Sequence, residues 1–310
     1  MTVVVAGATG LAGSAIFKAF ESQGHDVIGV NRTVLNLMDS RQTEDFIVKV
    51  KPSLIVDAAA RVGGIGANNS YPVEFLNDNI VIQGNLMRAA HKALVPNFVF
   101  LGSSCIYPRD CAQPIKEEYL MTGPLEATNS AYAVAKIAGI EMVNSYRKEY
   151  GIKWISLMPT NLYGPGDNFD LNASHVLPAF IRRFIEATET GADKVTLWGS
   201  GSPLREFLHV DDLAKAVLVA TEKYDSSLHL NVGTGEDISI RDLAQKVANA
   251  AGFFGQIEWD SSKPDGTPRK VLDVSRMKAL GWKPTITLEE GITSTIAWYK
   301  EAIIRGEVRK

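Results

Sequence analysis

Tyr132 and Lys136 have the residue types and the spacing of a pair that can transfer a proton to or from a carbonyl oxygen. On a helix, positions i and i+4 share one face, so the ammonium can lie near the phenol. A nearby cation lowers a tyrosine pKa from its usual value near about 10. We therefore expect Tyr132 to exchange a proton with a carbonyl group during hydride transfer. The same spacing also arises by chance, with the tyrosine as a packing residue.

A glycine-rich turn lies between an apolar run and a helix-like segment near the start of the sequence. Its spacing is G-x-x-G-x-x-G, and its residues are Gly7, Ala8, Thr9, Gly10, Leu11, Ala12 and Gly13. The glycines permit close approach of a pyrophosphate, and the helix N-terminus offers free N–H groups and a partial positive charge. This context predicts a dinucleotide site rather than a purely structural turn.

Arg32 follows the second predicted strand, residues 26–30, where an acidic residue would accept hydrogen bonds from the ribose 2′-hydroxyl of NAD. A guanidinium there suits the 2′-phosphate of NADP, although a solvated surface arginine is the alternative. Asp39, a few residues further on, is a candidate contact for the adenine edge. It could equally cap a helix that starts at Ser40.

Apolar runs alternate with helix-like segments along the first half of the chain. Strands are expected at residues 3–6, 26–30, 54–59, 98–102 and 154–158, and helices at 11–20, 46–50, 81–92 and 132–150. The alternation predicts an α/β fold with a Rossmann-like, doubly wound parallel sheet and right-handed crossovers. Ser103 ends one of these strands, and there it could donate a hydrogen bond to the carbonyl oxygen that meets Tyr132.

The pattern of apolar and polar residues changes near Pro165. Turn-forming residues gather there, and the segments that follow are shorter and more irregular. We expect an NADP-binding domain over residues 1–165, to which residues 207–233 return. A smaller, interleaved C-terminal α/β domain over residues 166–206 and 234–310 would then bind substrate. Asp211 and Asp212 are expected to cap a helix at Leu213.

Composition excludes several classes of protein. The chain has 310 residues and a formal net charge of −3, whereas a general nucleic-acid binder needs a basic face. No window approaches the roughly 18 apolar residues of a membrane span, and the first residues show no secretory signal pattern. Two cysteines give neither a disulfide framework nor a zinc site. We expect a cytoplasmic protein without a metal.

Four longer segments add to the glycine turn and the Tyr132–Lys136 pair. They are GSSCIYP at 102–108, MPTNLYGP at 158–165, REFLHVDD at 205–212 and KPDGTPRK at 263–270. With these motifs, in this order, essentially the whole chain resembles the extended short-chain dehydrogenase/reductase family. Within it, the chain is similar to the GDP-L-fucose synthase family, the 3,5-epimerase-4-reductases of GDP-4-keto-6-deoxy-D-mannose. The resemblance implies a GDP-sugar substrate and NADP(H).

The resemblance also implies two stages of chemistry in one site. Cys105 would remove protons α to the C4 ketone, and His175 would return them on the opposite face of the sugar. A thiolate is reachable near neutral pH if a cation lowers its pKa, and histidine titrates in the right range. Tyr132 would then protonate the C4 oxygen as NADPH supplies hydride. The alternatives are a buried packing cysteine and a histidine that merely begins a helix.

The family pattern assigns the remaining contacts by position. Further residues at the NADP(H) site would be Leu101, Gly102, Ser103, Ser104, Lys136, Pro159, Thr160, Asn161, Leu162 and His175. The substrate residues would be Arg183, Trp198, Arg205 and Asp265. Arginine suits diphosphate oxygens because its planar fork binds them bidentately, although Arg183 could be a solvated helix residue. A homodimer paired through the Tyr132 helix is also implied.

Two other kinds of function remain open. One is another nucleotide-sugar epimerase or dehydratase of the same superfamily. A 4,6-dehydratase typically has a glutamate beside its active-site Ser or Thr, where this chain has Ser104 and Cys105. The other is a non-enzymatic NADP-sensing protein, which would usually have lost the tyrosine or the lysine.

Overall fold

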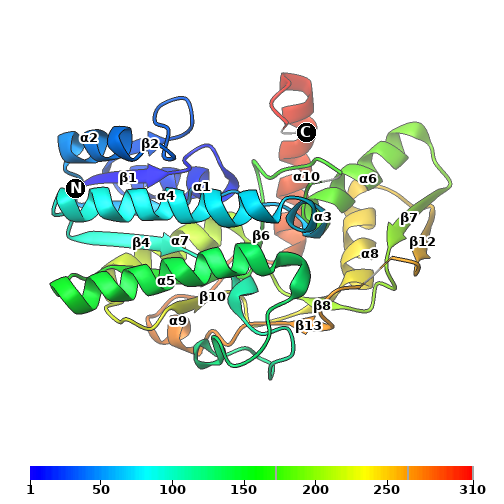
Figure 1. Cartoon of the computed structure of the whole chain (residues 1–310). Coiled ribbons are helices and arrows are strands. Elements are labelled where there is room, and N and C mark those ends of the chain that lie inside the picture. The colour runs from blue at the N-terminus through cyan, green and yellow to red at the C-terminus, as the bar shows by residue number, and fades with distance from the viewer. Residues whose placement is uncertain (172, 264, 309–310) are drawn as a thin grey trace.

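A parallel sheet covered by helices on both faces forms the larger part of the molecule (Figure 1). The computed structural model describes residues 1–171, 173–263 and 265–308. Over that part of the chain the large sheet has the order β10-β5-β4-β3-β1-β2, with all neighbours parallel. The strands are β1 (Thr2–Ala6), β2 (Asp26–Val30), β3 (Leu54–Asp57), β4 (Asn97–Leu101), β5 (Ile155–Pro159) and β10 (Leu230–Val232). The predicted Rossmann-like α/β class is confirmed.

Helices bury both faces of this sheet, which explains its continuous apolar runs. One face packs against α2 (Ser40–Val50), α4 (Pro72–Lys92) and α5 (Ser130–Tyr150). The other face packs against α1 (Leu11–Ser22), α7 (Val210–Lys223) and α9 (Ser275–Ala279). Side chains alternate between the two cores: Val4 faces α4 and α5, whereas Val3 and Val5 face α1 and α7.

The carboxyl ends of the parallel strands meet at one edge of the sheet, where ligands bind in open α/β folds. Short elements follow the strands at this edge and cover it. They are α3 (Ile65–Ser70) after β3, then η1 (Ser104–Ile106), η2 (Glu117–Tyr119) and η3 (Ala127–Asn129) after β4. The side chains of these connections can therefore converge on one place.

A third core lies beyond this edge of the sheet, on the right in Figure 1. It is built from α6 (Val176–Thr190), α8 (Ile240–Ala251) and α10 (Leu288–Arg305). Its strands are β7 (Lys194–Trp198) with β12 (Gln256–Asp260), and β8 (Leu204–Arg205) between β11 (Ile238–Ser239) and β13 (Arg269–Lys270). The parallel pair β6 (Asn161–Tyr163) and β9 (Phe207–His209) connects this region with the sheet. The chain thus passes between the two regions more than once.

The start of α7 differs from expectation. The helix begins at Val210, and the Nδ1 atom of the N-cap residue His209 accepts from the Asp211 N–H at 3.3 Å. The prediction that Asp211 and Asp212 cap it at Leu213 is therefore wrong. Asp212 is fully buried and accepts hydrogen bonds from the Thr285 and Ile286 N–H groups, both at 2.8 Å. Its carboxylate fixes the loop that leads into α10.

Among the described residues, none of the helices is both long enough and apolar enough to cross a membrane.

Candidate active site

The glycine turn passes very close to the chain that leaves β3. Gly7 has φ +78°, and its N–H donates to the Val30 carbonyl at 2.8 Å. A Cβ on Gly7 would lie 2.7 Å from the Ala58 carbonyl oxygen, and one on Gly13 would lie 2.1 Å from the Gly7 oxygen. Helix α1 starts at Leu11 with Gly10 as its N-cap residue, and no side chain among the described residues caps its N–H groups. The residues present therefore fit the cradle of a dinucleotide pyrophosphate.

The expected adenosine end lies at the turn after β2. Arg32 is exposed there, and the side chain of Asn31 accepts from the Thr33 N–H at 2.9 Å, which holds the turn. Asp39 is the N-cap of α2, and its carboxylate accepts hydrogen bonds from the Arg41 and Gln42 N–H groups at 2.9 and 3.0 Å. Of the two roles open for Asp39, the structure displays helix capping.

Two further backbone segments lie at the same carboxyl edge of the large sheet. The Gly102 N–H donates to Leu157 at 2.8 Å, and a Cβ there would lie 2.3 Å from the Met158 side chain. The Thr160 N–H donates to a β10 carbonyl at 3.0 Å, and Asn161 Nδ2 donates to the Glu206 carbonyl at 2.8 Å. The segments Leu101–Ser104 and Pro159–Leu162 thus lie side by side after β4 and β5.

Helix α5 carries Tyr132 and Lys136, the pair expected to transfer a proton. Lys136 is 3% exposed, and its Nζ donates to the Leu101 carbonyl at 2.9 Å. The same Nζ lies 4.8 Å from the centroid of the Phe100 ring and 5.9 Å from that of Tyr132. The edge of the Phe75 ring meets Tyr132 with a centroid separation of 6.2 Å. Contacts within the protein therefore hold both side chains in place.

The pKa of Tyr132 differs from the sequence-based expectation. Burial raises it, and negative charge on Cys105 would raise it further. The predicted lowering of the Tyr132 pKa is wrong for this structure, because burial is the largest effect on the phenol, although the Lys136 ammonium lies 5.9 Å from the centroid of its ring. Tyr132 is therefore a neutral phenol at neutral pH, which is the form that can donate a proton.

Cys105 lies in the single turn of η1, directly after β4. Ser103 is the N-cap of this turn, and its Oγ accepts from the Cys105 N–H at 3.4 Å. Burial raises the pKa of the thiol, while Lys270, the Ser103 hydrogen bond and Lys136 lower it. Cations that lower the thiol pKa are present, as expected, but burial is the largest of these effects, so the thiol is protonated near neutral pH.

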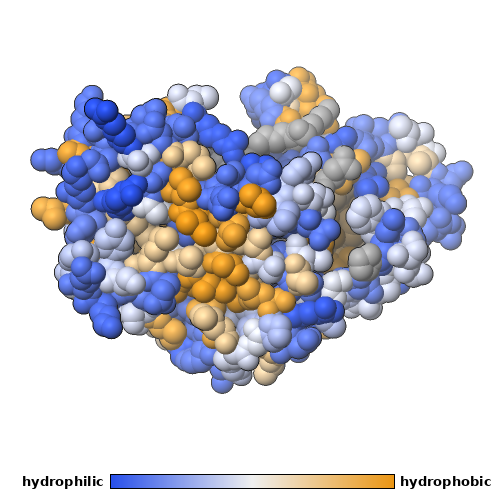
Figure 2. Space-filling view, in the orientation of Figure 1, coloured by the Kyte–Doolittle hydropathy of each residue, from blue (hydrophilic) through white to orange (hydrophobic). Residues whose placement is uncertain are grey.

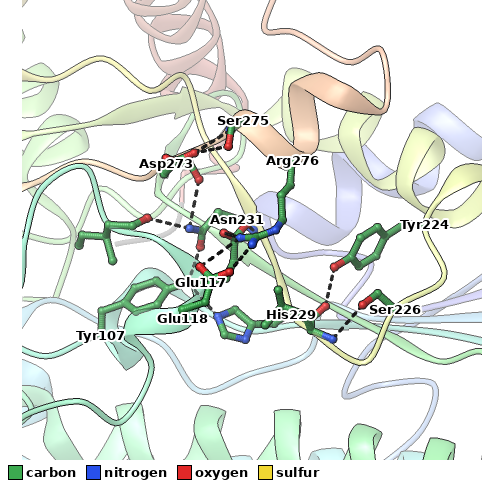
Figure 3. Close-up of polar contacts among 12 residues, drawn as sticks. Tyr107, Glu117, Glu118, Tyr224, Ser226, His229, Asn231, Asp273, Ser275 and Arg276 are labelled. Atoms are coloured by element: carbon green, nitrogen blue, oxygen red, sulfur yellow. Dashed lines mark hydrogen bonds and ion pairs between the residues drawn. The ribbon is translucent and has the colours of Figure 1, made fainter.

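A buried polar network begins at Tyr107, the residue that ends the Cys105 turn (Figure 3). Tyr107 is 3% exposed; its hydroxyl donates to Asn231 Oδ1 at 2.5 Å and lies 2.9 Å from His229 Nε2. The Asn231 N–H donates to Glu117 Oε1 at 3.1 Å. Because the Tyr107 proton is committed to Asn231, His229 must donate from Nε2. Burial lowers the pKa of His229 to about 4, so it is neutral near neutral pH.

The outer side of this network is an ion-paired cluster on the surface. Arg276 of α9 pairs with both Glu117 and Glu118. Beside it is a cavity of about 450 Å³ lined by Lys116, Glu118, Tyr119, Asp273, Ser275 and Arg276. Arg276, Glu117 and Glu118 are paired with one another, so we interpret the network as a structural support for the segment after Cys105. Sequence reasoning missed it, because its members are distant along the chain.

His175 is the N-cap residue of α6, and its side chain is exposed. A glycine segment after β3 supports the residues just before it. The Gly64 N–H donates to the Ala173 carbonyl at 3.0 Å, and a Cβ on Gly64 would lie 2.7 Å from the Ser174 oxygen. Asn68 Nδ2 in turn donates to the Gly64 carbonyl at 3.1 Å. The position of His175 therefore depends on a contact that only glycine allows.

Lys270 connects the two sides of the site electrostatically. Desolvation by the surrounding protein lowers the pKa of His175 although its side chain is exposed, and the Lys270 ammonium lowers it further. The same ammonium lowers the pKa of Cys105. The charge of Lys270 therefore acts on both Cys105 and His175. The nearby Glu206 carboxylate is fully buried and accepts from the Leu272 N–H at 2.9 Å, which fixes the segment that carries Lys270.

The expected substrate residues lie around β7, β8 and the segment before β13. Trp198 is 67% exposed, and the Lys263 ammonium lies 5.7 Å from its ring centroid. Asp265 accepts from both the N–H and the hydroxyl of Ser200 at 2.7 Å. Arg205 is half-buried, pairs in register with Lys270, and has a pKa lowered by burial.

Asp265 links the members of this group. A Cβ on Gly199, next to Trp198, would lie 2.3 Å from Asp265 Oδ1, and the negative charge of Asp265 acts on Arg205. These residues are therefore neighbours. Arg183 lies half-buried on α6 and, in the described part of the chain, makes no hydrogen bond or ion pair with them.

No group of three or more His, Cys, Asp or Glu side chains within residues 1–171, 173–263 and 265–308 is arranged to hold a metal ion.

Comparison with known proteins gives consistent matches. Residues 3–233 match the model of the NAD dependent epimerase/dehydratase family. The chain is 49% identical over 304 residues to the putative GDP-L-fucose synthase 2 of Arabidopsis thaliana, covering 98% of this chain and 93% of that one. It is 49% identical over 309 residues to the GDP-L-fucose synthase of Escherichia coli K12, covering 96% of each.

A solved structure supports the same grouping. The crystal structure of a GDP-L-fucose synthetase from Naegleria fowleri bound to NADP superposes with a TM-score of 0.91 at 28% identity. The match covers 100% of this chain and 96% of that one.

Proposed function

The chain belongs to the NAD dependent epimerase/dehydratase family, and from that premise we propose that it converts GDP-4-keto-6-deoxy-D-mannose to GDP-L-fucose. The reaction is 3,5-epimerisation followed by NADPH-dependent reduction of the 4-keto group. One observation carries the proposal: the turn that holds Cys105 directly follows the strand whose last carbonyl, Leu101, binds Lys136 of the reductase pair. The charge of Lys270 acts on both Cys105 and His175. A reductase alone would need only Tyr132 and Lys136.

NADP(H) fits the glycine cradle at the start of α1. Gly7–Gly13 would hold the pyrophosphate, and Arg32 would meet the 2′-phosphate. The segments Leu101–Ser104 and Pro159–Leu162, with Lys136 and His175, would line the reactive end. When bound, the cofactor supplies hydride for C4 of the sugar. Asp39 caps helix α2 at the edge of this site. A contact with the adenine would be a second role of the same side chain.

In the epimerisation, Cys105 removes the proton at C3 or C5, and the electron pair of the C–H bond moves into an enolate on the C4 oxygen. The hydroxyls of Ser103 and Tyr132 stabilise that oxygen by hydrogen bonding. His175 then gives a proton to the opposite face of the same carbon. Because burial raises the pKa of Cys105 and desolvation lowers that of His175, the thiol must lose its proton and the imidazole gain one before this step.

In the reduction, Tyr132 gives its phenolic proton to the C4 oxygen while hydride arrives at C4. Its raised pKa keeps the phenol protonated until that moment. The Lys136 ammonium is the nearby cation that stabilises the phenolate left behind. Arg183 and Arg205 would bind the diphosphate, and the exposed ring of Trp198 together with Asp265 would meet the nucleoside. Lys270 adds positive potential between the diphosphate and Cys105.

A homodimer is part of the proposal. Figure 2 shows a broad apolar patch over α4 and α5, whose outer faces expose residues such as Val73 and Val134. Two copies of this helix pair would form a four-helix interface. We further propose a cytoplasmic location, because a reaction that uses a free thiol and NADPH suits a reducing compartment.

The proposed domain limits are residues 1–165 with 207–233 for NADP binding, and 166–206 with 234–310 for the substrate.

The direct experiment is product analysis. The purified protein with GDP-4-keto-6-deoxy-D-mannose and NADPH should oxidise the cofactor and yield GDP-L-fucose by NMR. Absence of turnover with that pair would contradict the proposal. Reduction without inversion at C3 and C5 would instead support a 4-reductase, and solvent exchange without reduction would support an epimerase.

A further inference from the structure

Asp57 is a buried acid that none of the chemistry above uses. It ends β3 and is 1% exposed. Its Oδ1 accepts from the Ala59 N–H at 3.2 Å, whereas its Oδ2 is buried without a hydrogen-bond partner among the described residues. A buried carboxylate oxygen with no donor is costly unless a charge compensates it. The compensating charge should therefore be close to the end of β3.

The strand register shows where the carboxylate points. Asp57 pairs with Ala6 on one side and with Phe100 on the other, so these side chains share one face of the sheet. Ala6 and Phe100 both pack in the core beneath α4 and α5. The Lys136 Nζ reaches the same face from α5, 4.8 Å from the centroid of the Phe100 ring. The carboxylate and the ammonium thus flank one aromatic ring.

Among the charged and titratable groups around Lys136, Asp57 is the one that can supply a negative charge at neutral pH. Burial lowers the pKa of Lys136, while Asp57 and Cys105 raise it, and Tyr132 lies on its own helix. Cys105 and Tyr132 are both neutral at neutral pH, since burial raises their pKa values. Burial also raises the pKa of Asp57, to about 6, against the effect of Lys136. At neutral pH the Asp57 carboxyl is therefore deprotonated, and its charge opposes the lowering of the Lys136 pKa by burial.

We propose that Asp57 is a positioning residue for the reduction, whose buried carboxylate balances the charge of the Lys136 ammonium beside Tyr132. The inference rests on the proposed function in one respect, that Lys136 serves the reduction. Asp57 does not touch the reacting atoms. It preserves the cation that the phenolate of Tyr132 needs after proton transfer.

The substitution Asp57→Asn tests this, because it keeps the size and the bond from Ala59 but removes the charge. Without the anion the pKa of Lys136 falls, so the ammonium is lost at lower pH. The alkaline limb of the kcat/KM profile for reduction should move down by about one pH unit, and Asp57→Glu should restore part of it. If the alkaline limb of the Asp57→Asn profile lies at the same pH as that of the wild-type enzyme, the proposal is overturned.

Asp212→Asn is the matched control, since it also neutralises a fully buried carboxylate, but one bound to Thr285 and Ile286. It should lower Tm and leave the alkaline limb in place. Tm and NADPH affinity are measured for each variant, so that loss of folding is separated from loss of charge. A limb that moves equally in both variants would contradict a specific role of Asp57.

A titration that needs no sugar substrate provides the second test. The carboxyl of Asp57 is followed by ¹³C NMR in the wild-type protein and in Lys136→Met. Because coupling between two sites is reciprocal, removing the ammonium should raise the pKa of Asp57 above about 6. An unchanged Asp57 titration overturns the proposal, even if Asp57→Asn fails to fold. If the wild-type enzyme does not turn over the GDP-sugar, only the proposed function fails.

Discussion

The two reactive pairs of this site are held in contrasting ways. Tyr132 and Lys136 lie one turn apart on α5, packed against Phe75 and Phe100. Cys105 lies in the short turn η1, and His175 lies at the N-terminus of α6, in a different region of the chain. In the proposed reaction, proton donation in the reduction therefore rests on one helix, α5. The proposed epimerisation depends on how accurately two segments from different regions are brought together, and this difference can be tested by substitution.

The largest expected effect separates reduction from epimerisation. Tyr132→Phe removes the proton donor, so reduction should fall by roughly 10²–10⁴-fold, as is typical for loss of a general acid. Solvent deuterium uptake at C3 and C5 should persist at a reduced rate, because Cys105 and His175 remain. NADPH oxidation and NMR of the recovered sugar give the two rates. Equal loss of both would show that the two pairs do not act separately.

A smaller effect is expected from the loop that supports His175. A methyl at Gly64 would lie 2.7 Å from the Ser174 oxygen, so Gly64→Ala should displace the histidine. We expect deuterium uptake to slow by about 10–100-fold, since misplacement by about 1 Å has effects of this size. Reduction of the already epimerised ketone should change little. Gly84→Ala in α4, where the nearest group is 3.9 Å away, is the control and should leave both rates unaltered.

The smallest effect is expected from the polar network that begins at Tyr107. Tyr107→Phe removes the hydroxyl that donates to Asn231 and leaves its buried oxygen without that donor. The free energy of unfolding should fall by about 1–3 kcal/mol. Deuterium uptake should decrease a few-fold, and reduction less. Urea unfolding followed by the exchange assay tests this, and an exchange rate equal to that of wild type would show that the turn needs no such support.

The sequence predicts the helix-borne pair better than the loop-borne pair, for a physical reason. The spacing of Tyr132 and Lys136 reflects the helical repeat, and the apolar runs reflect strands buried on both faces. The residues that hold Cys105 and His175 act through backbone contacts between distant segments. Gly64 with Ala173 and Tyr107 with Asn231 leave no periodic signal. Only the resemblance to a family pointed to Cys105 and His175.

Two expectations about pKa values differ from the structure, because a pKa depends on burial and on where a neighbouring charged group points. Sequence spacing places Lys136 near Tyr132 but does not show that its ammonium donates to Leu101. Spacing likewise does not measure the desolvation that raises the pKa of Cys105. Asp57 did leave a signal, since an acidic residue ends an otherwise apolar strand. Its meaning required the register that places it beside Phe100.

Deuterium uptake by Cys105→Ser tests the central claim most directly. The variant is incubated with GDP-4-keto-6-deoxy-D-mannose in D₂O, first without and then with NADPH, and the sugar is analysed by NMR. The account predicts that uptake at C3 and C5 is suppressed, while direct reduction of the unepimerised ketone by Tyr132 and NADPH remains. Uptake at the wild-type rate would contradict the assignment of Cys105 as the base and, with it, the separation of the two pairs.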